Sequence, residues 1–162
     1  ALEPAGAPHV ETLTQVDTYF DAPHRDFATT DEALRIRQQD GTDERTVLTY
    51  KGPLVEAASK TREELETTIE DADTATALLE SLEFTVAATV EKERDRYRLS
   101  GYTVTLDTVA GLGEFLEVET GVETESAIGP ARSEAAALLG DLGLDPDAQI
   151  RTSYLGLLLR DN

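Results

Sequence analysis

Four charged residues occupy every second position of segment 60–66, so that a β-strand would place them on one face. Successive side chains of a strand point to opposite faces, and the shared face would carry Lys60, Arg62, Glu64 and Glu66. Two cations followed by two carboxylates could bind phosphate oxygens and a divalent metal ion. A solvated outer face could carry the same row, so this stretch alone does not decide between the two.

The same kind of face recurs in other segments that we predict as strands, namely 14–21, 33–38, 46–51, 90–98, 102–107 and 114–119. The clustered cations are Arg35, Arg37, Lys51, Lys60, Arg62, Lys92, Arg94 and Arg96, and the clustered acids are Glu64, Glu66, Asp107, Glu117 and Glu119. The recurrence favours a function for these faces over chance.

The opposite faces of most of these segments are apolar and need helices to cover them, whereas segment 90–98 is polar on both faces, with Glu91, Glu93, Asp95 and Tyr97 opposite its cations. Helical spacing or capping residues predict helices over 71–84, 130–142 and 154–160, with Asp71 or Asp73 as an N-cap. Residues 1–10, with His9, and the turn at 22–26, with His24, read as loops, so a paired-histidine metal site is not expected. We therefore predict a single α+β domain over residues 1–162, with an antiparallel sheet and helices outside it.

Curling this sheet into a barrel or tunnel would place both charged sets around one interior. Like charges that converge in a buried space require a ligand, because uncompensated buried charge is very costly. Clustered cations suit a polyphosphate, and neighbouring carboxylates suit Mg²⁺ or Mn²⁺.

The composition of the chain excludes several kinds of binding partner and chemistry. The chain has 162 residues, a formal net charge of −19 and no cysteine. Such a surface repels nucleic acid and anionic membranes, and cysteine chemistry is excluded. We expect a cytoplasmic protein, because the sequence has no signal peptide and no apolar run that could span a membrane. The excess of acids and the scarcity of lysine suggest a cytoplasm rich in salt.

Several motifs occur in an order that resembles the CYTH superfamily, the triphosphate tunnel metalloenzymes, which include class IV adenylate cyclase and thiamine triphosphatase. The resemblance runs from about residue 13 to 159. The matching stretches are Gln15–Phe20, Leu34–Arg37, Thr49–Gly52, Arg62–Glu66, Glu91–Arg94, Leu106–Asp107, Glu114–Glu119 and Arg151–Leu155. The Ser-Tyr-Leu ending is most similar to the class IV adenylate cyclase branch.

The resemblance implies a role for each charged set. The triphosphate would be bound by Arg35, Arg37, Lys51, Lys60, Arg62, Lys92 and Arg94, among which Lys51, Arg62 and Lys92 are the catalytic candidates. Glu117 and Glu119, with Glu64, Glu66 or Asp107, would hold one or two Mg²⁺ or Mn²⁺ ions. Asp17 is expected at most to support these residues. Tyr19 and Tyr154 are expected to be packing residues with a hydrogen-bonded hydroxyl rather than to stack on a base.

Three functions remain open under this resemblance. The first is conversion of ATP to cyclic AMP and pyrophosphate, the second is hydrolysis of inorganic or thiamine triphosphate, and the third is binding without catalysis. A homodimer is suggested by analogy alone. The family usually opens with a Glu-x-Glu-x-Lys strand that this chain lacks, so we expect the first strand and most of the first helix to be missing, and activity to depend on them.

Overall fold

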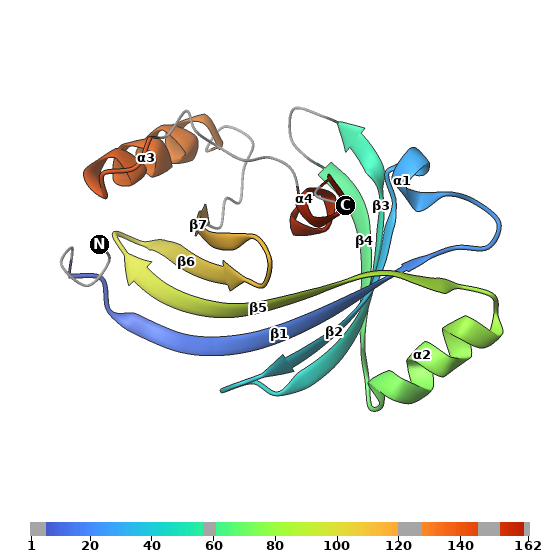
Figure 1. The fold of residues 1–162 in the computed structure, drawn as a ribbon. Coiled ribbons are helices and arrows are strands. Elements are labelled where there is room, and N and C mark those ends of the chain that lie inside the picture. Colours follow the sequence, from blue (N-terminus) through green and yellow to red (C-terminus); the bar gives the residue numbers. More distant parts are fainter. Residues whose placement is uncertain (1–5, 57–60, 120–127, 146–152, 161–162) are drawn as a thin grey trace. The chain divides into compact units, whose positions relative to one another are not determined.

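The structure is a computed structural model, which describes residues 6–56, 61–119, 128–145 and 153–160. Seven strands form one sheet in the order β4-β3-β2-β1-β5-β6-β7 (Figure 1). The strands are β1 (His9–Asp21), β2 (Ala33–Asp40), β3 (Arg45–Glu56), β4 (Thr61–Ile69), β5 (Thr85–Leu99), β6 (Tyr102–Val109) and β7 (Gly113–Glu119). The helices are α1 (Phe27–Thr30), α2 (Ala72–Ser81), α3 (Ile128–Asp141) and α4 (Tyr154–Arg160).

The predicted fold class is confirmed as an antiparallel sheet with a few helices. The strand order is linear. In the described part of the chain no pairing joins β4 to β7, so the sheet is not closed by hydrogen bonds. No helix among the described residues is long and apolar enough to cross a membrane.

The chain divides into two compact units, which we describe separately. One comprises Leu13–Lys92, with Asn162, and is called here the 13–92 unit. The other comprises Ala1–Thr12 and Glu93–Asp161 and is called the 93–161 unit. Strands β1 and β5 contribute residues to both units.

The apolar core of the 13–92 unit lies between one face of its strands and helix α2. Phe20, Ile36 and Ala72 are buried there, with Leu79 of α2 packed against them. The alternation of a strand puts Phe20 and Ile36 on the face opposite to the charged residues. Asp71 is the N-cap of α2, as predicted, and its side chain accepts hydrogen bonds from two backbone amides of the first turn. The helix therefore leaves the charged face of the unit to the strands alone.

The core of the 93–161 unit is smaller. Val104 of β6 is fully buried, and Leu116 and Val118 of β7 pack against its cluster. Leu138 of α3 covers the same cluster, which confirms that the apolar face of β7 packs on a helix. The opposite face of β6 and β7 carries the acidic residues.

Several elements differ from the prediction. His9 lies in β1 rather than in a loop, because pairing with neighbouring chain extends the strand beyond its Pro- and Gly-rich start. Strand β3 continues past Pro53 to Glu56, and two register shifts against β4 accommodate the proline. Helix α1 was not predicted, since four residues are too few to show a helical period.

Candidate functional site

The charged residues of the 13–92 unit fall on one face because the strand register aligns them. Tyr19 lies opposite Arg35, and Asp17 lies opposite Arg37. Arg35 in turn lies opposite Thr49 of β3. The remaining members of this face are Lys51 on β3, Arg62, Glu64 and Glu66 on β4, and Lys92 on β5. The structure thus brings five of the predicted cations into one unit.

Arg35 is a buried cation that forms no direct ion pair with a carboxylate of the described residues. It is 8% exposed, and its Nη2 donates to the Thr49 hydroxyl at 3.4 Å. Among the described residues, its Nε has no hydrogen-bond partner, and no carboxylate oxygen lies within ion-pair distance of the guanidinium. A buried charge in this state is costly, and an anionic ligand would supply the missing partner.

Lys51 likewise has more positive than negative charge around its ammonium group. Burial lowers the pKa of its ammonium, and the positive charge of Arg35 lowers it further, as do Arg37 and Arg62. Glu64 acts in the opposite direction, but its carboxylate is 4.0 Å from Nζ. The positive charge of the arginines therefore disfavours the protonated form of Lys51, and an anion bound among these cations would relieve their mutual repulsion.

Asp17 is the buried counter-charge of this face. Its side chain is 1% exposed, and it accepts hydrogen bonds from Arg37 Nε at 2.6 Å and from Nη2 at 2.7 Å. Lys92 Nζ lies 3.8 Å from the same carboxylate. Burial raises the pKa of Asp17, but the bond and charge of Arg37, helped by Lys92, outweigh burial and hold the pKa below 3.8.

This lowered pKa predicts how stability depends on pH. The stabilisation from ionised Asp17 is complete above its unfolded value of 3.8 and disappears as the pH falls through the lower folded value. We expect the difference in unfolding free energy between wild type and Asp17→Asn to shrink below pH 3.8. Denaturant unfolding at a series of pH values measures it, with the exposed Asp40→Asn as control. A difference that stays constant over the acid range would contradict the assignment.

The residues of β4 lie nearer to solvent. Arg62 Nη1 donates to the Gly52 carbonyl at 3.2 Å, and its Nη2 lies 3.6 Å from Asp31. Glu66 accepts from the Thr49 hydroxyl at 3.3 Å. Lys60 lies outside the described residues.

The charged face of the 93–161 unit is built around Asp107, which is 0% exposed. Arg94 Nε and Nη2 donate to its two oxygens at 2.7 and 2.6 Å. The Tyr154 hydroxyl of α4 donates to the same carboxylate at 2.9 Å and lies 3.3 Å from Glu117. Burial and these two carboxylates raise the pKa of Tyr154, so the hydroxyl keeps its proton. Glu119 pairs through its backbone with Thr103, and its side chain is outside the described set.

The predicted metal ligands fit a divalent ion by their chemistry, because carboxylate oxygens are the donors that Mg²⁺ and Mn²⁺ prefer. Among the described side chains no three histidines or carboxylates gather closely enough to form a metal site. Glu117 is the most accessible candidate in its unit, with a side chain 41% exposed. Among the described side chains of this unit, the fit thus rests on Glu117.

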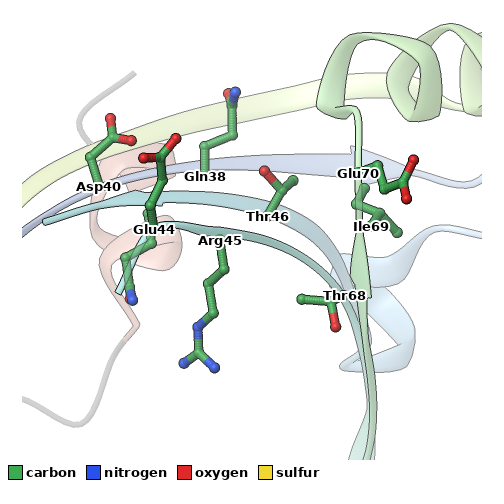
Figure 2. A pocket seen from close by; sticks show the side chains of 9 residues that line it. Gln38, Asp40, Glu44, Arg45, Thr46, Thr68, Ile69 and Glu70 are labelled. Carbon is green, nitrogen blue, oxygen red and sulfur yellow. The ribbon is translucent and has the colours of Figure 1, made fainter. Parts of the chain in front are cut away.

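A cavity of about 720 Å³ lies in the 13–92 unit at the ends of β2, β3 and β4 (Figure 2). Asp40, Glu44 and Glu70 line it together with the single cation Arg45. Carboxylates in excess disfavour a polyphosphate here, so we place the phosphate site on the strand face with Arg35 and not in this cavity.

The hydrogen-bonded hydroxyl predicted for Tyr154 is confirmed, but its acceptors, Asp107 and Glu117, could not be predicted from the sequence. Asp17 is predicted only as a supporting residue, although it is the buried counter-charge of its face. Thr49, which joins Arg35 to Glu66, was not considered. Their contribution depends on which residues lie opposite one another, and the alternation of charges along single strands does not contain this information.

The chain matches the family model of the CYTH domain over residues 2–154. It therefore belongs to the CYTH domain family, and the resemblance inferred from the motifs is confirmed. Proteins of this family are metal-dependent and act on triphosphates as adenylate cyclase-like enzymes or as triphosphatases.

Two curated relatives carry cyclase names. A candidate adenylate cyclase of Methanocaldococcus jannaschii is 37% identical over 156 residues, covering 96% of this chain and 87% of the relative. The adenylate cyclase CyaB of Aeromonas hydrophila is 27% identical over 143 residues, covering 88% and 71% respectively.

Solved structures show the same fold. A protein of Pyrococcus horikoshii superposes with a TM-score of 0.83 at 40% identity, covering 96% of this chain and 89% of its own. An adenylyl cyclase candidate from Hippeastrum, described with a dominant triphosphatase activity, superposes with a TM-score of 0.69 at 20% identity, covering 95% and 85%. The tunnel-like CYTH fold of these neighbours matches the chain.

Proposed function

We propose that this protein is a metal-dependent enzyme of the class IV adenylate cyclase type, which converts ATP to cyclic AMP and pyrophosphate. The observation that carries the proposal is buried Arg35, which has no carboxylate partner among the described residues. It lies beside Lys51, whose pKa is lowered by burial and by neighbouring arginines. The cyclase names of the two curated relatives support the choice of reaction.

In this proposal the cations bind and orient the triphosphate. Arginines offer two-point hydrogen bonds to phosphate oxygens, and lysines act as point charges. Lys51, Arg62 and Lys92 would lie at the reacting phosphate and stabilise the charge that develops there. The triphosphate-binding set is Arg35, Arg37, Lys51, Lys60, Arg62, Lys92 and Arg94.

Glu117 and Glu119, with Glu64, Glu66 or Asp107, would hold Mg²⁺ or Mn²⁺. When bound, the metal ion neutralises charge on the phosphate oxygens. In the cyclase reaction the 3′-hydroxyl oxygen bonds to the α-phosphorus while pyrophosphate leaves, and the hydroxyl proton passes to solvent or base. An acidic composition with only three lysines further suggests that the enzyme works in a salt-rich cytoplasm.

Triphosphate hydrolysis is the second candidate, because the Hippeastrum neighbour shows that this fold also occurs with triphosphatase activity. Water then attacks the terminal phosphorus, its bond to the bridging oxygen breaks, and the diphosphate leaves while the terminal group becomes inorganic phosphate. The same cations and metal serve both reactions.

Product analysis separates these functions. The full-length protein in concentrated KCl with Mg²⁺ or Mn²⁺ is given ATP, inorganic triphosphate or thiamine triphosphate. We expect cyclic AMP and pyrophosphate from ATP, and their loss in Glu117→Gln. Phosphate without cyclic AMP would identify a triphosphatase, and binding without turnover of any of the three would identify a binding module.

A further inference from the structure

A buried aspartate that binds the guanidinium of an arginine on the neighbouring strand occurs in each unit. In the 13–92 unit, Asp17 of β1 binds the guanidinium of Arg37 on the neighbouring strand β2 through Nε and Nη2. In the 93–161 unit, Asp107 of β6 binds Arg94 on the neighbouring strand β5 through the same two nitrogens. Both aspartates are almost completely buried, at 1% and 0% exposure. Two independent occurrences indicate a shared role.

The oxygens of Asp107 already accept three short hydrogen bonds. Oδ1 accepts from Arg94 Nε, and Oδ2 accepts from both Arg94 Nη2 and the Tyr154 hydroxyl, all within 2.9 Å. A metal ion on this carboxylate would compete with Arg94 for the same negative charge. It would also leave the Arg94 charge buried beside a second positive charge, which is strongly unfavourable.

Glu117 differs from Asp107 in each of these respects. Its side chain is 41% exposed, its Oε2 lies 3.7 Å from Arg94, and its Oε1 lies 3.3 Å from the Tyr154 hydroxyl. It can turn toward a metal ion without breaking a short two-point ion pair.

We propose that Asp107, like Asp17, is a positioning residue that holds an arginine of the triphosphate site, and that the divalent ion is bound without it. This inference rests on the proposed function and selects among the metal ligands named there. Each aspartate fixes one edge of its guanidinium, so the arginine is held in one orientation before the triphosphate arrives, which lowers the cost of ordering it on binding.

The test measures two affinities of the full-length protein. Mn²⁺ binding is followed by electron paramagnetic resonance, and binding of inorganic triphosphate by calorimetry. For Asp107→Asn we expect Mn²⁺ affinity close to that of wild type and triphosphate affinity lower by roughly tenfold, as the loss of a charge-assisted bond implies. For Glu117→Gln we expect Mn²⁺ affinity to fall by roughly tenfold or more. The exposed Asp40→Asn should change neither affinity.

A double-mutant cycle identifies the route by which Asp107 acts. If it acts through Arg94, the double variant Asp107→Asn, Arg94→Gln binds triphosphate as Arg94→Gln alone does, because coupled residues are not additive. If the single Asp107→Asn variant does not fold, the double variant, which removes both buried charges, supplies the Mn²⁺ measurement. Asp17→Asn with Arg37→Gln provides the matched pair in the other unit.

The outcomes separate the two claims. Loss of Mn²⁺ affinity in Asp107→Asn or in the double variant to the extent seen in Glu117→Gln overturns the positioning role and makes Asp107 a metal ligand. Additive losses of triphosphate affinity in the cycle overturn it as well. A wild-type protein that binds neither Mn²⁺ nor triphosphate rejects the proposed function itself, and this inference with it.

Discussion

Replacing Arg35 by leucine is expected to reduce kcat/KM by about a hundredfold or more, because it removes charge-assisted hydrogen bonds to the triphosphate. The same substitution should leave the free energy of unfolding unchanged or raise it. In the ligand-free protein this buried guanidinium has an unpartnered Nε and no carboxylate within ion-pair distance among the described residues. A residue whose removal costs activity and not stability is typical of a functional site.

The matched control is Arg45→Leu, at an exposed arginine of the same sheet, which should change neither quantity. Steady-state kinetics and denaturant unfolding of both variants provide the comparison. Equal kinetic effects at Arg35 and Arg45 would show that the protein responds only to net charge. A large loss of stability at Arg35 would show that it is structural.

Replacing Phe20 by alanine is expected to have the opposite effect: a large loss of stability with little change in triphosphate binding. Phe20 is 2% exposed in the apolar core beneath α2, and truncating a buried phenylalanine costs about 3–5 kcal/mol. This is a large part of the roughly 5–15 kcal/mol that stabilises a typical domain. Under conditions in which the variant remains folded, triphosphate affinity should stay close to that of wild type, because the side chain lies on the face opposite to Arg35.

Leu78→Ala is the control for Phe20→Ala, since Leu78 is an apolar residue of α2 that is 57% exposed. It should cost much less than the buried residue in the same denaturant experiment. If the two substitutions cost the same, α2 would not cover the apolar face of this sheet in solution.

Much of the fold could be predicted because strand alternation is a local property. The order of charged and apolar residues places Arg35 and Arg37 on one face of β2 and Leu34 and Ile36 on the other. Asp71 followed by a helical period likewise predicts the start of α2. Local patterns of this kind also supported the family resemblance, because its motifs occur within single strands.

The pairings could not be predicted because they depend on the register between strands distant in sequence. Asp17 and Arg37 are 20 residues apart, and nothing in either segment shows that they lie opposite each other. Tyr154 and Asp107 are 47 residues apart, so the sequence around Asp107 does not show that the Tyr154 hydroxyl donates to its carboxylate. The ends of β1 and β3 were missed because tertiary pairing prevailed over local loop signals.

The central claim is that the cationic face of the 13–92 unit binds a triphosphate, and calorimetric titration of the full-length protein tests it most directly. Inorganic triphosphate is titrated in concentrated KCl with Mg²⁺, with monophosphate in parallel. The account predicts one triphosphate per chain, bound far more tightly than monophosphate, and loss of this binding in Arg35→Leu but not in Arg45→Leu. Equal, weak binding of both anions, or triphosphate binding that survives in Arg35→Leu, would contradict it.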